Sequence, residues 1–339
     1  MHADAVIRRY VLILAAILAG LVGAVSVAVP AGADPSIDEG GSATLRDQLD
    51  AASKGYLDAK VKLDASKARQ DQLTAQLAAV QGSFATQSDA VQAISAAAYR
   101  LGGAGMGQLS GIVNSDSPAV FLDRLSLLNV VAASQDHVVH QLAVTRDSVT
   151  QAKAAIDAEI TQQQAQLADM TRRKAAAEKA LRVAGGGQAT SGFSATSKQA
   201  LPAPRNADGS WPPESCSVND PTTSGCITPR TLHAMNQAKA AGFTRYVSCY
   251  RSGGSGEHPK GRACDFAAAV GGFGGTATGD ERTYGNNLAA YFVNNANRLG
   301  VLYVIWFRQI WLPGSGWRAY SGSGSPAADH TNHVHLSEY

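Results

Sequence analysis

Three histidines and one aspartate in the C-terminal part of the chain have the types and spacing of metal ligands. His258 and Asp265 lie seven positions apart, across the stretch "HPKGRACD", and His333 and His335 lie two positions apart near the C-terminus. Side chains two positions apart in a strand point to the same face, so His333 and His335 would face the same way. Two imidazoles and one carboxylate would leave the fourth position of a zinc ion open to water, as in catalytic zinc sites.

Each of these residues alone has a simpler interpretation. A His-x-His pair is common, an aspartate after a glycine-rich loop often caps a turn, and a loop histidine such as His258 is more often a surface residue than a ligand. The chain has only eight histidines, however, and the two spacings occur together on segments with strand-like composition. The combination therefore favours a metal site.

The elements that would hold these residues mix strands and helices over residues 216–339. Thr228 followed by Pro229 predicts the start of a helix, and Gly242 predicts its end. Runs of β-branched and aromatic residues predict strands. The expected strands cover residues 245–251, 262–269, 301–307 and 332–339, and a second helix covers residues 283–299 before Gly300. This pattern predicts an α+β domain with a small antiparallel sheet.

All four cysteines lie in this region, at positions Cys216, Cys226, Cys249 and Cys264. Their spacing contains no Cys-x-x-Cys pair, and an even count in an exported chain favours disulfides over a thiolate metal site. Three pairings are open. We favour Cys216–Cys226, which closes a short loop, together with Cys249–Cys264, whose sulfurs meet if their two strands are antiparallel neighbours.

The N-terminus is typical of an export signal over residues 1–33. Arg8 and Arg9 precede an almost entirely apolar stretch over residues 10–29, and Ala31-Gly32-Ala33 is a suitable cleavage site. An uncleaved membrane anchor is the alternative, because about 20 apolar residues can span a bilayer. Either way we expect a secreted or cell-envelope protein. The net charge of +2 gives no indication of nucleic-acid binding.

Residues 34–183 have the pattern of an antiparallel coiled-coil hairpin. Apolar residues recur at intervals of three and four from Leu45 to Ala98, and Ser117-Pro118 predicts the start of a second helix. The apolar stripe of that second helix is expected at Leu142, Val149, Ile156, Ile160, Leu167, Met170 and Leu181. The Gly- and Ser-rich residues 101–117 would form the turn. From the residues alone, a simple spacer and a regulatory or docking arm are equally supported.

Residues 184–215 contain mainly Gly, Ser, Ala and Pro without periodicity. This composition is typical of a flexible linker. We therefore expect the hairpin and the domain over residues 216–339 to move relative to each other.

The stretch "YRSGGSGEHPKGRACDF" followed by "NHVHLS" resembles a known family. It is similar to peptidoglycan zinc metallopeptidases of the D-Ala-D-Ala carboxypeptidase, lysostaphin and hedgehog-like group, and "YVIWFRQIW" resembles an actinobacterial branch of that group. The resemblance implies a hedgehog-like fold, Zn²⁺ on His258, Asp265 and His335, and a substrate-orienting role for Arg251. It also implies hydrolysis of an amide bond in the peptidoglycan stem peptide.

One position departs from the carboxypeptidase pattern. Members of that type carry a Glu or Asp three residues before the last ligand, as general base, and this chain has Asn332 there. An amide cannot take up a proton at any useful pH. Lysostaphin-like members use the first histidine of His-x-His, which is His333 here, and His330 and Asp329 could assist. The expected function is an exported zinc peptidase, and the alternative is a catalytically inactive peptidase-like protein that binds cell wall or activates another hydrolase.

The segment "SDSPAVFLDRLSLLNVVA" resembles the coiled-coil arms of exported cell-wall hydrolases. Such arms dock on membrane complexes of the division machinery and restrain the enzyme. The resemblance favours a regulatory arm over a spacer. It implies a membrane division complex or another hydrolase as partner, besides the stem peptide.

Overall fold

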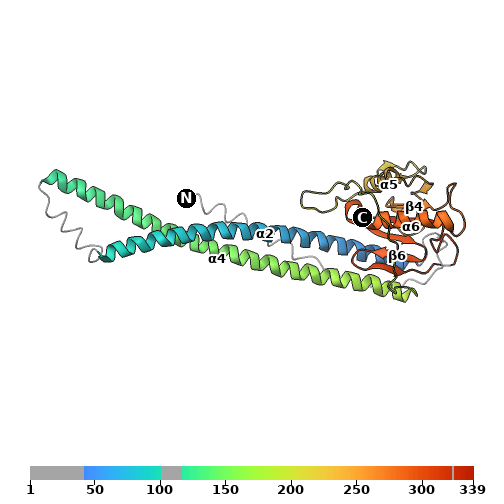
Figure 1. Cartoon of the computed structure of the whole chain (residues 1–339), viewed down its shortest axis with the longest axis horizontal. Helices are drawn as coiled ribbons and strands as arrows, with labels where there is room; N and C mark the ends of the chain where they lie inside the picture. Colours follow the sequence, from blue (N-terminus) through green and yellow to red (C-terminus); the bar gives the residue numbers. More distant parts are fainter. Residues whose placement is uncertain (1–41, 101–116, 323) are drawn as a thin grey trace. The chain divides into compact units, whose positions relative to one another are not determined.

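The structure is a computed structural model that describes residues 42–100, 117–322 and 324–339. Two long helices, α2 (Ala43–Arg100) and α4 (Pro118–Val183), form an arm, and the C-terminal part combines a small antiparallel sheet with short helices (Figure 1). The chain is thus an α+β domain preceded by a two-helix arm. The expected export signal, and residues 101–116 of the turn expected at 101–117, lie outside the described residues. Within the described ranges, no helix is long and apolar enough to cross a membrane.

The two arm helices run antiparallel. Near the sheet domain, Gly55 of α2 lies against Arg173 of α4, and farther along α2 the Arg69 Nε donates to Glu159 Oε1 at 2.9 Å. The second helix begins where its capping signal predicts, because Ser117 Oγ accepts a hydrogen bond from the Val120 amide at 3.3 Å.

The apolar seam is thin along most of α2. The residues expected on it from Leu73 to Ala98 are half-buried, whereas the buried residues of α2 lie between Leu45 and Ser66. The helix pair therefore has a dense seam only near the sheet domain.

On α4 the expected stripe is wrong at two positions, since Ile160 is 37% and Leu167 is 50% exposed. A half-buried row runs instead through Ala152, Glu159 and Gln166, which are spaced seven positions apart. Glu159 accepts a hydrogen bond from Ser66 Oγ of α2 at 2.5 Å. Polar contacts thus replace part of the apolar seam that the heptad pattern predicts.

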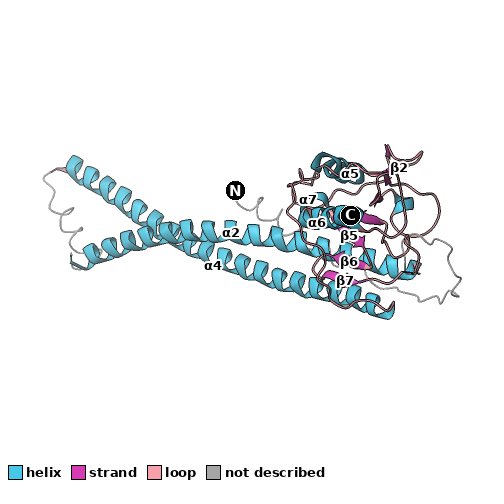
Figure 2. Cartoon of the chain, turned by 45° about the vertical axis from the view of Figure 1, so that its right-hand side comes forward, coloured by secondary structure: helices cyan, strands magenta, loops and turns pink. Residues whose placement is uncertain are grey.

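Six antiparallel strands form the sheet, in the order β3-β4-β8-β5-β6-β7. Strands β5, β6 and β7 are labelled in Figure 2. Four of them match expected strands, although β3 is much shorter than expected. They are β3 (Val247–Ser248), β4 (Ala263–Ala267), β5 (Val301–Trp306) and β8 (His333–Glu338). Sequence reasoning missed the hairpin of β6 (Gln309–Leu312) and β7 (Gly316–Ala319), and the small sheet of β1 (Val218–Asn219) and β2 (Cys226–Ile227).

Two helices flank the sheet on its core side. Helix α5 (Pro229–Ala241) has the predicted ends, with Thr228 Oγ1 accepting from the Thr231 amide and Gly242 at φ 110°. The second expected helix is divided into α6 (Gly279–Asn294) and α7 (Ala296–Leu299). The break falls at Asn295, whose side-chain amide donates to the carbonyls of Tyr291 and Lys198. These bonds hold the chain in the turn between the two helices.

The sheet is buried on both faces. One face packs on α5 and α6 through residues such as Val304, Val334 and Leu336. The other face packs on the base of the arm. That second cluster contains Leu302, Tyr303, Ile305, Ile310, Leu312 and Tyr320 from the domain, and Leu45, Leu49, Ala52, Ala177, Ala180 and Leu181 from the arm. The arm therefore completes a hydrophobic core of the domain.

Residues 184–215 also lie against the domain. The amides of Gly187 and Thr190 donate to the carbonyls of Ala319 and Trp317, and the Ala203 amide donates to Arg298. Ala200, Ala203 and Trp211 are buried. These contacts differ from the free spacer that the composition suggests, because a polar, glycine-rich segment can still pair its backbone with a sheet edge.

Both favoured disulfides are present, Cys216–Cys226 and Cys249–Cys264. The second links the end of β3 to β4, which are antiparallel neighbours with Ser248 opposite Asp265. The condition set for the Cys249–Cys264 pairing, that the two strands are antiparallel neighbours, is thus met. Disulfides are typical of proteins in oxidising, extracytoplasmic compartments.

Candidate metal centre

Strand register brings the candidate ligands together. Asp265 on β4 is paired with His335 on β8, and His335 is paired with Ile305 on β5, so the three side chains share the sheet face that the arm covers. His258 lies in a short 3₁₀ helix (His258–Lys260) between β3 and β4. His258, Asp265 and His335 are all buried, and together they form a group that could hold a metal ion.

The donor atoms of the three side chains lie close enough together to bind one metal ion. His258 Nε2 is 3.2 Å from Asp265 Oδ2 and 3.3 Å from His335 Nδ1, and His335 Nδ1 is 2.9 Å from Asp265 Oδ1. Ligand atoms at 2.0–2.1 Å from zinc in tetrahedral geometry lie about 3.3 Å apart. The three side chains could therefore hold one metal ion in the positions that they occupy.

The outer nitrogen of each ligand histidine is also engaged. His258 Nδ1 bonds to the Cys249 carbonyl, and a carbonyl can only accept, so Nδ1 carries a proton and the Nε2 of the neutral ring can present its lone pair to a metal ion. His335 Nε2 lies 2.8 Å from Ser337 Oγ, which can accept a hydrogen bond from Nε2–H and so leave the lone pair of Nδ1 for a metal ion. Metal-bound histidines usually have such outer partners, which orient the ring.

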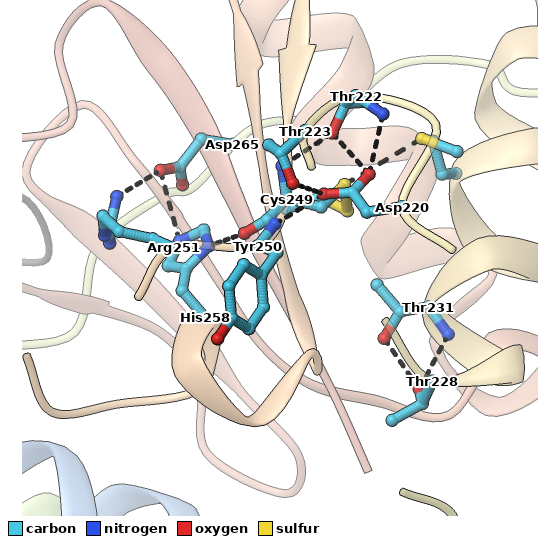
Figure 3. The surroundings of a disulfide bond; sticks show 12 residues. Asp220, Thr222, Thr223, Thr228, Thr231, Cys249, Tyr250, Arg251, His258 and Asp265 are labelled. Carbon is cyan, nitrogen blue, oxygen red and sulfur yellow. Dashed lines mark hydrogen bonds and ion pairs between the residues drawn. A yellow bond between two sulfur atoms is a disulfide. The ribbon is translucent and has the colours of Figure 1, made fainter. Parts of the chain in front are cut away.

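The backbone that holds His258 is itself fixed. Cys249, whose carbonyl accepts from His258, is joined by its disulfide to Cys264, the residue before Asp265. Asp220 accepts from the Tyr250 amide at 2.8 Å and from two threonine hydroxyls of its own loop (Figure 3). Gly261 after the 3₁₀ helix has φ 70°, and a Cβ there would lie 2.6 Å from Cys216 Sγ. Two disulfides and one glycine thus hold the ligand loop in place.

Burial and neighbouring charges set the ionisation of the ligands. Burial alone would raise the pKa of Asp265, but electrostatic interaction with His258 and His333 and hydrogen bonding with His258 and His335 hold this pKa well below its usual value. Burial lowers the pKa of His335 to about 4, against the opposing effect of Asp265. At neutral pH the site therefore presents a carboxylate and a neutral imidazole, the forms that bind metals.

The other two expected residues border this cluster. Arg251 Nη1 lies 3.4 Å from Asp265 Oδ2, and its side chain is partly exposed (Figure 3). His333 Nε2 lies 3.4 Å from Asp265 Oδ1. The structure thus brings His258, Asp265, His335, His333 and Arg251 together from segments up to 84 positions apart (335 − 251).

Two neighbours of the site, Ser337 and Tyr303, were not expected. Ser337 shares the face of His335 and was recognisable from the strand period. Tyr303 stacks on His335 with ring centroids 5.6 Å apart, and no sequence signal indicates this contact.

Of the two residues expected to assist the base, His330 is buried in a left-handed backbone conformation, with φ 51° and its ring centroid 4.7 Å from that of His333. Burial lowers the pKa of His330 well below its usual value, and electrostatic interaction with His333 and His335 lowers it further. Asp329 instead pairs with Arg308 at 2.6 Å.

Comparison with known families concerns the sheet domain. The family model described as the VldE C-terminal domain is similar to residues 223–331. This span includes His258 and Asp265 and ends before His333. No curated protein and no solved structure matches the chain.

Proposed function

We propose that the protein is an exported zinc peptidase that cleaves amide bonds in peptidoglycan stem peptides, with a hedgehog-like catalytic domain and a regulatory arm. The observation that carries the proposal is the ligand geometry. Two buried histidines direct their inner nitrogens toward one carboxylate, and their outer nitrogens are held by the Cys249 carbonyl and Ser337. The resemblance to peptidoglycan metallopeptidases gives the substrate class.

A zinc ion held by His258, Asp265 and His335 would lower the pKa of a bound water toward ~7 and polarise a carbonyl. The chain's own groups supply the remaining functions. His333 borders the cluster and takes a proton from the attacking water, then gives it to the leaving amine. Arg251 is partly exposed beside Asp265 and binds a substrate carboxylate or the developing oxyanion.

The arm restrains this site. Arg46 in the first turn of α2 donates a hydrogen bond to Ser255, in the glycine-rich loop that leads to His258. One turn later, Asp50 Oδ2 lies 3.6 Å from Arg262 Nη2. Arg262 also forms an ion pair with Glu257, the residue before His258. Movement of the arm base would therefore move the loop that carries a ligand.

The outer part of the arm is the proposed docking surface for a membrane division complex or another hydrolase. The first turns of α4 expose large apolar side chains, among them Leu122 at 62%, Leu127 at 64% and Val130 at 63%. Large apolar side chains exposed close together in the sequence could form such an interaction surface.

Digestion of purified muropeptides by the full chain tests the proposed activity. We expect cleavage of a stem-peptide amide, loss of cleavage with a chelator, and recovery when zinc is added back. If the zinc-loaded protein cleaves no stem peptide but still binds cell wall, the inactive alternative is correct.

A further inference from the structure

Asn332 occupies the position where a catalytic carboxylate was expected, but its side chain is directed away from the ligand cluster. The Nδ2 group donates to the Gly274 carbonyl at 2.8 Å. The Oδ1 atom lies 2.7 Å from His333 Nδ1. Asn332 therefore contacts the residue expected to be the base, and a carboxylate at this position would not face the metal site in this backbone conformation.

The orientation of this amide is determined by its partners. The Gly274 carbonyl can only accept, so the atom facing it must be Nδ2, and Oδ1 must face His333. Because Oδ1 can only accept, His333 Nδ1 must carry the proton in this bond. In the neutral ring, the lone pair then resides on Nε2, because the 3.4 Å from Nε2 to Asp265 Oδ1 is longer than an ordinary hydrogen bond, whereas the 2.7 Å from Nδ1 to Asn332 Oδ1 is within the usual range.

The ring of His333 is also held from the sides. Phe273, next to Gly274, contacts it with centroids 5.5 Å apart, and His330 contacts it at 4.7 Å. The backbone of Asn332 is fixed as well, since its carbonyl accepts from the Ala268 amide at 2.9 Å, beyond the end of β4. These contacts fix the position of the ring, and the hydrogen bond to the side chain of Asn332 determines which ring nitrogen carries the proton.

We infer that Asn332 is a positioning residue that fixes His333 in the Nδ1–H tautomer and so directs a basic Nε2 at the metal site. The inference rests on the proposed function for its catalytic meaning, and it changes the interpretation of the missing carboxylate. A general base must present a lone pair to the water that it deprotonates. Asn332 provides this orientation without taking up a proton itself.

The test combines a spectroscopic and a kinetic measurement on the full chain with ¹⁵N-labelled histidine. Long-range ¹H–¹⁵N spectra report the tautomer of each ring, and loss of one set of signals in His333→Gln assigns His333. We expect a protonated Nδ1 and an unprotonated Nε2 for His333 in the unmodified protein. In Asn332→Ala the Nε2–H form should gain population, and peptidase activity should fall by about 10–100-fold, the usual effect of losing an outer-sphere partner.

Two further variants separate positioning from a general structural effect. Asn332→Asp keeps an acceptor for Nδ1, so it should keep the Nδ1–H tautomer and retain more activity than Asn332→Ala. Asn294→Ala is the matched control, because Asn294 on α6 also makes two side-chain hydrogen bonds, to Ala195 and Ser197, far from the cluster in sequence. It should change neither the tautomer nor the activity.

The inference is overturned if His333 has the Nε2–H form in the unmodified protein, or if Asn332→Ala leaves its tautomer unchanged. The tautomer of the unmodified protein needs no variant and no turnover. An inactive protein with an Nδ1–H His333 would therefore refute the proposed function and leave the positioning role intact.

Discussion

The sheet domain and the arm are stabilised in different ways. In the domain, the strands that carry Asp265 and His335 are buried on both faces, and a disulfide links β4 to the end of β3. In the arm, buried residues are confined to the base, between Leu45 and Ser66 on α2 and between Ala177 and Leu181 on α4. Beyond the base, a half-buried seam and exposed apolar residues remain.

This difference agrees with the proposed roles of the two regions, metal binding in the sheet domain and partner binding by the arm. Metal ligands must be held within a fraction of an ångström, which requires a densely contacted backbone. A helix pair with a thin seam keeps apolar surface available for a partner. The arm base is the connection between the two, because its residues complete the core under the same sheet face that carries His335 and Asp265.

The largest effect should come from the ligands. His258→Ala and His335→Ala should each reduce zinc from about one ion per chain to near zero, because two protein ligands do not hold catalytic zinc tightly. Peptidase activity should fall below detection. Metal content by mass spectrometry checks this, with His233→Ala on α5 as the control that keeps zinc. Full zinc occupancy in the His258→Ala, His335→Ala double variant would refute the ligand assignment.

The next effect concerns His333, which borders the cluster without belonging to it. His333→Ala should keep zinc and lose activity by about 10²–10⁴-fold, the contribution of general acid–base catalysis. Parallel measurement of zinc content and the rate of stem-peptide hydrolysis separates the two roles. Loss of zinc together with activity would make His333 a ligand instead.

A smaller effect is expected at the connection between arm and domain. Arg46→Ala removes the hydrogen bond to Ser255, and a hydrogen bond from a charged group contributes about 1.5–3 kcal/mol. If that contact holds the ligand loop closed, loss of the whole bond should let the variant hydrolyse stem peptides about 10- to 150-fold faster. Lys60→Ala, whose ion pair with Asp64 lies within α2, is the control. Equal rates for the two variants would argue for an arm that localises the enzyme without restraining it.

The smallest effect concerns stability of the domain core and its pH dependence. Glu338 is buried, neither carboxyl oxygen has a hydrogen-bond partner among the described residues, and burial raises its pKa well above the usual value, against the opposing charge of Arg230. The folded state thus keeps a proton that the unfolded state releases above about pH 4.5, so stability is lost as the pH rises from there toward the folded-state pKa.

Glu338→Gln should remove this loss, because glutamine is neutral at every pH. Thermal melts should show the variant stabilised by about 1–3 kcal/mol at pH 8, with little difference from the unmodified protein at pH 4. A gain that is the same at both pH values would indicate better packing and not the removal of a titrating group.

Features that depend on neighbouring residues were predictable from the sequence. Thr228 and Gly242 mark the ends of α5 because a capping hydroxyl and a left-handed glycine act on the adjacent turn. Ser117 marks the start of α4 for the same reason. The candidate ligands were recognisable because His258 and Asp265 belong to one local stretch and His333 and His335 to one strand. The cysteine pairing followed from two strands that were expected to be neighbours.

Other features were decided by contacts between distant segments. The β6–β7 hairpin, the packing of residues 184–215 on the sheet and the burial of Leu45 and Leu49 under Tyr303 depend on surfaces that exist only after folding. The same holds for Asn332. Its residue type shows only that it cannot be a base, whereas its orientation depends on the carbonyl of Gly274, 58 positions earlier in the chain. A hydrogen bond of this kind is set by the tertiary structure, because the local sequence does not specify which distant group will meet the side chain.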